Sequence, residues 1–251
     1  MKNTRKLIPA LAMLIVSAVL LSTASFAWFT TNSNVKASSM EVKATTGANL
    51  YIAKDAGVEL AGITGISVEN LGVTATSLRP AHVVAADTVA KVQDAATYSE
   101  DPTLGSAGVA ATYTDIATVS ATTSTNVGDN KIADYAAVAF VSLARKQTTA
   151  AKFTLTATCT ITLGTESELN KALRVAVVID DKAYIADGVT PASGKSTFSI
   201  NIDSALTDNV AYSAALLIWF EGSDEHCTIN NATLSNNIAA WSFTSADYTG
   251  E

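Results

Sequence analysis

Residues 153–163 have the sequence FTLTATCTITL, and this stretch decides the fold class. Six apolar residues alternate with five threonines along it. A period of two places every apolar side chain on one face of a β-strand and every threonine on the other. A helix would distribute the same threonines around its circumference. The stretch therefore predicts a strand with one buried face and one face in water.

The same alternation returns in shorter segments, at residues 40–45, 198–202 and 239–244. Two further segments, residues 136–143 and 211–220, are apolar at nearly every position. Continuous apolar runs of this length are typical of central strands that are buried on both faces. The chain therefore combines strands of both kinds.

Residues 174–185 predict a β-hairpin, because two apolar runs flank the sequence DDK at 180–182. We expect one helical turn at residues 169–172 and one strand at residues 112–119 within a loop-rich region. At about 8–12 residues per strand and turn, residues 134–246 accommodate roughly seven or eight strands. The predicted fold is all-β, an antiparallel sandwich of two sheets with jelly-roll character.

The N-terminus has the three-part pattern of a secretory signal peptide. Lys2, Arg5 and Lys6 precede an uncharged apolar run at residues 7–21, and small residues dominate the six positions that follow. An uncleaved transmembrane anchor is the alternative, because the run and its extension just reach the length of about 20 residues that a spanning helix needs. The serines and threonines at the end of the run favour a cleaved signal helix.

Two cleavage positions fit the small-residue rule. Ser25 and Ala27 occupy the −3 and −1 positions of a cut before Trp28. Ser22 and Ala24 would serve for a cut before Ser25. We expect the first cut, so that the mature protein is exported and begins at Trp28.

Removal of residues 1–27 takes away three basic residues and no acidic one, which changes the formal net charge from −7 to −10. An acidic chain without a basic patch repels phosphate backbones and anionic membrane surfaces. We therefore expect no nucleic-acid partner, and membrane contact only before cleavage.

The residues that enzymes use for catalysis are scarce. The chain has two histidines, His82 and His226, and it contains no HExxH, GxSxG, P-loop or GxGxxG motif. A catalytic zinc site would need three protein ligands and a base. The sequence therefore predicts neither catalytic residues nor a cofactor, and a secreted hydrolase is the least favoured function.

A cluster of carboxylates follows the apolar run at residues 211–220. Glu221, Asp224 and Glu225 could donate oxygen ligands to calcium, although their spacing is not that of an EF-hand. A turn that faces water explains the same residues, because charged loop clusters are usually solvated. We favour the solvated turn and keep calcium as a weak candidate.

The two cysteines leave two possibilities open. Cys159 lies on the apolar face of the strand at residues 153–163, and Cys227 follows the carboxylate cluster. An exported chain with an even number of cysteines permits a Cys159–Cys227 disulfide. Two buried thiols are the alternative. The role is structural in either case.

The junction SFAWFTTNSNVKASSMEVKA at residues 25–44 resembles that of the TasA/camelysin (CalY) family, exported fibre subunits of Gram-positive bacteria. It shares a small-residue cleavage site, an aromatic start, a polar stretch and an alternating strand with that family. The resemblance implies a jelly-roll sandwich, processing by a signal peptidase of the SipW type, and polymerisation through the freed N-terminal strand. Camelysin has been classed with metallopeptidases, but no residues here support that activity.

The resemblance implies three segments: a signal peptide at residues 1–27, an N-terminal arm and donor strand at 28–46, and a single β-sandwich domain at 47–251. It makes Trp28, Phe29, Val35 and Ala37 the residues of the donor arm. An extended arm can add a strand to an open sheet edge of a neighbour. Alternatively, Trp28 and Phe29 pack on their own domain.

The favoured function is a secreted subunit of extracellular filaments, of the biofilm-matrix or pilus type. Its expected partners are identical subunits, the signal peptidase and other matrix proteins. The alternative is a monomeric β-sandwich adhesin or binding module, secreted or at the cell surface. Such a module needs an exposed aromatic platform, whereas Trp219 and Trp241 occupy core-like positions in their strands.

Overall fold

The structure, a computed structural model, describes residues 36–44, 49–69, 71, 78–94, 113–149, 151–162, 168–186, 190–192, 194–224, 226–227 and 236–249. All of them belong to one compact unit, residues 34–251. Their secondary structure consists of strands β1–β15 and three short 3₁₀ helices, η1 (Leu60–Gly62), η2 (Ile132–Asp134) and η3 (Glu168–Ala172). The predicted all-β class is confirmed, and η3 lies where one helical turn was expected.

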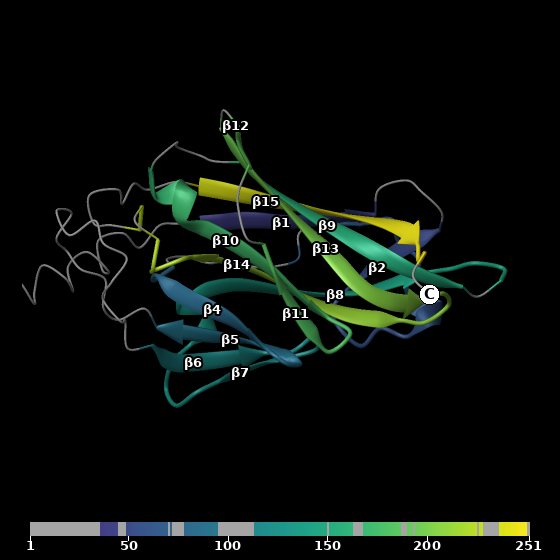
Figure 1. The fold of residues 1–251 in the computed structure, drawn as a ribbon, viewed down its shortest axis with the longest axis horizontal. Coiled ribbons are helices and arrows are strands. Elements are labelled where there is room, and N and C mark those ends of the chain that lie inside the picture. Colours follow the sequence, from purple (N-terminus) through teal and green to yellow (C-terminus); the bar gives the residue numbers. More distant parts are fainter. Residues whose placement is uncertain are drawn as a thin grey trace, which may run out of the picture. The chain divides into compact units, whose positions relative to one another are not determined.

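Sheet A is the largest of three sheets and has six strands (Figure 1). In spatial order they are β12 (Thr190–Ala192), β13 (Lys195–Thr207), β9 (Lys152–Thr162), β15 (Asn236–Asp247), β1 (Lys36–Ala44) and β3 (Ser67–Val68). The alternating Thr/apolar stretch forms β9, whose apolar residues from Phe153 to Ile161 are all buried. The strand predicted from periodicity is therefore confirmed.

Sheet B has five strands, and its central strands carry the continuous apolar runs. In spatial order they are β11 (Lys182–Ile185), β10 (Leu173–Ile179), β14 (Tyr212–Phe220), β8 (Ala136–Arg145) and β2 (Leu50–Lys54). Strands β10 and β11 form the predicted antiparallel hairpin. Asp180 and Asp181 in its turn have φ of 51° and 54°, the left-handed conformation that two-residue hairpin turns require.

Sheet C is a feature that the two-sheet prediction missed. It contains the antiparallel strands β4 (Ala81–Ala86), β5 (Val89–Asp94), β6 (Thr114–Val119) and β7 (Ser124–Asn126). Strand β6 confirms the strand expected at residues 112–119. Strands β4 and β5 were not predicted, because their buried positions are occupied largely by alanine and valine, which give a weak periodic signal.

Two hydrophobic cores lie on opposite faces of sheet B. The larger core joins sheets A and B, and the smaller one joins sheets B and C. Along β14, Leu216 and Ile218 belong to the first core, whereas Leu217 and Trp219 belong to the second. Sheet B is therefore covered on both faces, which confirms that the run at residues 211–220 is a strand buried on both sides.

A buried ion pair ties the end of β8 to the turn between β13 and β14. The Arg145 guanidinium donates two hydrogen bonds to Asp208, and both side chains are almost completely buried, at 2% and 0% exposed. Arg145 also donates to Asp247 across 2.7 Å, but the Asp247 side chain is 84% exposed. Its guanidinium carbon lies 4.6 Å from the centre of the Phe153 ring. One cation thus connects sheets A and B.

Within the part of the chain that the structure describes, none of the helices is both long enough and apolar enough to span a membrane.

Candidate functional site

The seam between β1 and β15 is the first candidate site, because the segment predicted to act between subunits lies there. The two strands run parallel, with Lys36 opposite Asn236 at one end and Ala44 opposite Phe243 at the other. Every other pair of named strands in the described residues is antiparallel. The first described strand of the chain therefore lies directly beside the last.

Residues 40–43 of strand β1 alternate between buried and more exposed side chains. Met40 and Val42 are completely buried, whereas Glu41 is half-buried and Lys43 is exposed. Val42 lies opposite Trp241 of β15, which is also buried. Burial of side chains of this size stabilises the fold by roughly 1.5–3 kcal/mol each.

The outer edge of β1 is paired over a short length only. In the described residues, β3 pairs with it at Val42 and Lys43 and nowhere else. Two further backbone bonds reach this region, from the Ala44 N–H to the Ile66 carbonyl at 2.8 Å and from the Leu71 N–H to the Met40 carbonyl at 2.9 Å. Strand β1 is therefore held on one side by β15 along its length and on the other side at its C-terminal half.

Most of the predicted arm falls outside the described residues. This holds for the cleavage-site residues Ser25 and Ala27 and for the arm residues Trp28, Phe29 and Val35. Ala37 is described, and its backbone lies opposite Asn237 in the β1–β15 seam. The part of the predicted arm and donor strand that the structure describes is therefore β1.

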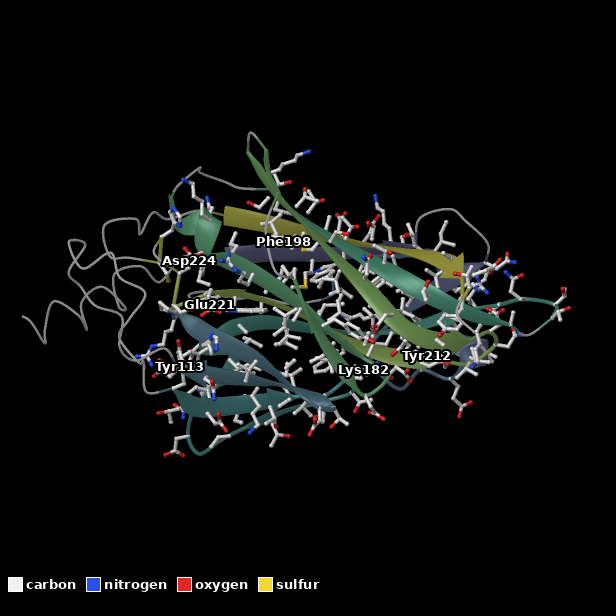
Figure 2. The ribbon with its side chains drawn as sticks, in the orientation of Figure 1. Tyr113, Lys182, Phe198, Tyr212, Glu221 and Asp224 are labelled. Atoms are coloured by element: carbon white, nitrogen blue, oxygen red, sulfur yellow. The ribbon has the colours of Figure 1, made fainter. Side chains whose placement is uncertain are left out.

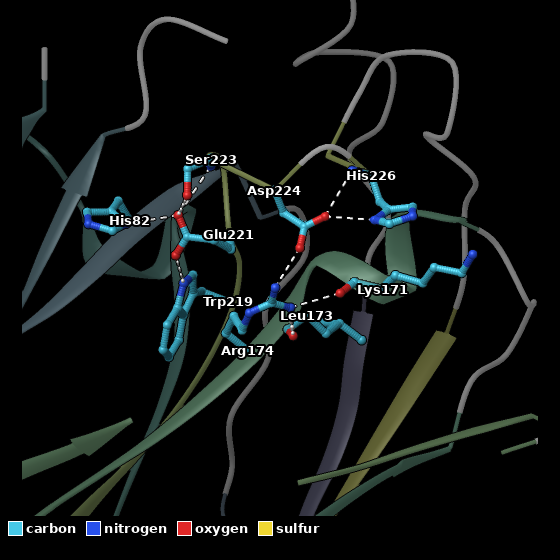
Figure 3. A network of polar contacts seen from close by, with 9 residues as sticks. All are labelled: His82, Lys171, Leu173, Arg174, Trp219, Glu221, Ser223, Asp224 and His226. Carbon is cyan, nitrogen blue, oxygen red and sulfur yellow. Dashed lines mark hydrogen bonds and ion pairs between the residues drawn. The ribbon is translucent and has the colours of Figure 1, made fainter. Parts of the chain in front are cut away.

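The second candidate site is a polar network where β14 ends (Figure 3). Glu221 follows the last residue of β14, and its carboxylate accepts hydrogen bonds from the Trp219 indole at 3.1 Å and from the Ser223 hydroxyl at 2.7 Å. Nδ1 of His82, on β4, lies 2.9 Å from the same carboxylate. A backbone hydrogen bond joins the same two segments, since the Gly222 N–H donates to the Ala81 carbonyl at 2.9 Å. Glu221 thus fastens sheet C to the end of a sheet B strand.

Asp224 is the centre of the second half of this network. It accepts hydrogen bonds from the Arg174 guanidinium of β10 and from the backbone N–H of His226, and Nδ1 of His226 lies 2.9 Å away. Burial alone would raise the pKa of Asp224, but the hydrogen bonds from His226 and Arg174 outweigh it and hold this pKa below its ordinary value of 3.8. Asp224 is therefore an ionised anchor for the turn.

These contacts bear on the calcium candidate. Glu221 and Asp224 point toward donors of the protein itself, and Glu225 lies outside the described residues. Among the residues that the structure describes, no group of three or more His, Cys, Asp or Glu side chains is arranged to hold a metal ion. Glu221 and Asp224 therefore hold neighbouring strands together through hydrogen bonds and ion pairs.

Of the two possibilities for the cysteines, a disulfide or two buried thiols, the structure has the second, with Cys159 and Cys227 both free and buried. Cys159 is fixed in the middle of β9, between Phe198 of β13 and Trp241 of β15. Burial raises the pKa of its thiol well above the ordinary value. Burial, with the nearby Asp224 and Glu221 carboxylates, raises the pKa of Cys227 to about 12. Each sulfur fills space in the core as a small apolar group.

Sequence reasoning missed the partners of both carboxylates. His82 lies 139 positions from Glu221 in the sequence, and Arg174 lies 50 positions from Asp224. No local spacing connects such residues. The available signal was general: a buried carboxylate needs a charged or hydrogen-bonding partner.

Comparisons with protein-family models, with curated proteins and with solved structures find no match for this chain.

Proposed function

We propose that this protein is a secreted subunit of extracellular filaments that assembles by exchange of its N-terminal strand after signal-peptide cleavage. The observation that carries the proposal is the β1–β15 seam: a terminal strand that is paired along its length on one edge, only over its C-terminal half on the other, and that buries Met40 and Val42 in the core. The jelly-roll connectivity, the signal helix and the location outside the cell belong to the same proposal.

The physics of exchange follows from the seam. Departure of β1 would leave without partners those N–H and C=O groups of β15 that face β1, and it would open the space that Met40 and Val42 fill. The β1 strand of a second copy has the same side chains, so it restores the same contacts at little net cost. An extended strand that satisfies an open sheet edge is a general mode of recognition.

Such an exchange builds a filament. A copy that donates β1 still has its own β15 edge open for the strand of another copy. This head-to-tail contact does not close on itself and therefore propagates. While the signal peptide is attached, the arm is tethered to the membrane, so cleavage is the natural trigger. Trp28 and Phe29 would then be free to anchor the arm on the neighbour.

Electron microscopy of a blocked and released protein tests the proposal. The chain is produced with a fusion before Trp28 and then cut to begin at that residue. We expect filaments only after the cut, and folded monomers when residues 28–34 are deleted. Monodisperse particles from the released protein would favour the monomeric binding module. Filaments that persist without residues 28–34 would show that the arm is not needed for assembly.

A further inference from the structure

The outer face of sheet A carries two rows of side chains that are related by a local symmetry. Val42, Trp241, Cys159 and Phe198 are in register across β1, β15, β9 and β13, and their side chains point inward, into the core. The positions of their backbones mark the central line of the outer face. The residues just before and after that line point outward, as their greater exposure shows. On one side of the line the row is Glu41, Ala240, Thr160 and Thr197, and on the other it is Lys43, Ser242, Thr158 and Ser199.

These two rows form what we call the threonine face. Apart from Glu41 and Lys43, its side chains are small and uncharged. The next row on the Lys43 side continues the pattern with Thr156, Asn201 and Thr244, and Thr156 hydroxyl donates to the Asn201 side-chain oxygen at 3.3 Å. Figure 2 shows oxygen-tipped side chains along the outer side of sheet A.

A two-fold axis that crosses the strands at the central line exchanges the two rows between facing copies. Under this operation, Glu41 of one copy lies opposite Lys43 of the other, and this happens twice. Thr158 lies opposite Thr160, and Thr197 lies opposite Ser199. Hydroxyl groups both donate and accept hydrogen bonds, so such pairs are self-complementary. The face therefore matches a second copy of itself, as an isologous contact requires.

Electrostatics favours the same partner. Without residues 1–27 the chain has a formal net charge of −10, so two copies repel each other over most approaches. The threonine face is neutral in sum, and the two-fold brings opposite charges together at its edge. Small side chains also permit the close sheet-to-sheet approach found in stacked β-sheets.

We propose that the threonine face is the lateral contact between copies of this chain, so that filaments associate side by side. The inference rests on the proposed function. Four strands spaced about 4.8 Å apart and three rows about 6.7 Å apart give on the order of 400 Å² per copy, whereas a stable interface buries about 800 Å² per partner. A single contact between two copies is therefore weak, but many such contacts along two filaments together hold the filaments side by side.

The test changes Thr197 and Ser199, which the two-fold places opposite each other. The variant T197E/S199E puts glutamates opposite glutamates, and T197K/S199E puts lysines opposite glutamates with the same number of new charges. A further control, T125E/V127E, adds two glutamates to exposed positions in and just after β7 of sheet C. Thermal melting verifies that each variant is folded.

The first readout does not depend on filaments. The full chain is displayed densely on gold particles, and clustering of the particles is followed by light scattering. Wild type, T197K/S199E and T125E/V127E should cluster, and T197E/S199E should reduce clustering about tenfold or more, because repulsion is multiplied over many contacts. Dispersed wild-type particles, or equal clustering of all variants, would overturn the lateral contact whatever the filament result.

The second readout is electron microscopy of filaments. Wild type should form bundles and T197E/S199E single filaments, with elongation intact in both. A failure to elongate in wild type would contradict the proposed function, while the particle assay would still decide the lateral contact. Bundles in T197E/S199E would contradict the lateral contact alone.

Discussion

Val42 of the N-terminal strand lies directly opposite Trp241 of the C-terminal strand, in parallel register, and both side chains are buried in the same core. This pair joins the two ends of the described chain. The Trp241 indole nitrogen is also the one buried side-chain polar atom in the described residues without a hydrogen-bond partner. The Trp241 side chain therefore contributes to the seam by packing, beside the backbone pairing of the two strands.

Substitution of Met40 by alanine should destabilise the protein by about 2–5 kcal/mol, because it removes a completely buried side chain and leaves a cavity beside β15. Chemical denaturation of the monomer measures the change. Lys43→Ala on the exposed side of the same strand is the control and should change stability by less than about 0.5 kcal/mol. Equal effects of the two substitutions would show that β1 is not packed as described.

The two aspartates that bind Arg145 should differ in how much they contribute to the stability of the fold. Asp208→Ala leaves a buried guanidinium without its main partner and should cost about 3–5 kcal/mol. Asp247→Ala removes an exposed partner of the same guanidinium and should cost less than about 1 kcal/mol. Urea unfolding of both variants tests the difference. A similar loss of stability in the two variants would show that burial does not decide the strength of these ion pairs.

Glu221→Ala should destabilise the junction of sheets B and C by about 1–3 kcal/mol, because the buried Trp219 indole N–H loses its acceptor. In a Trp219→Phe background the same substitution should cost less, since no indole N–H remains to be satisfied. The double-mutant cycle from denaturation curves measures this coupling. Additive effects would mean that the 3.1 Å hydrogen bond contributes nothing.

Acid should weaken the turn around Asp224. Because the folded pKa of this carboxyl lies below 3.8, its ionised form stabilises the fold above that pH, and the contribution is lost as the pH falls through the folded pKa. Asp224→Asn should therefore be less stable than wild type near neutral pH and should lose less stability below about pH 4. Unfolding curves recorded from pH 2 to 7 measure how the stability of each protein depends on pH. Parallel curves for the two proteins would contradict this role.

Features that depend on a local sequence pattern could be predicted, whereas contacts between distant segments could not. The alternation around Cys159 predicted β9, and the continuous run that ends at Phe220 predicted a strand buried on both faces. That run could not reveal what covers its second face, because the small alanines and valines of β4 and β5 have weak periodicity. The contacts of His82 with Glu221 and of Arg174 with Asp224 join distant segments, so only the folded chain brings them together. The sequence left a disulfide and two buried thiols both open for Cys159 and Cys227, because an even number of cysteines and export say nothing about where the two sulfurs lie.

A disulfide across the seam tests the central claim most directly. Lys43 and Ser242 are register partners in β1 and β15, so the variant K43C/S242C can lock β1 into its own subunit. If subunits assemble by strand exchange, the oxidised, locked protein remains monomeric after release at Trp28, and reduction allows filaments to form. Filaments of equal number and length from the locked and the reduced protein would contradict assembly by exchange of the N-terminal strand.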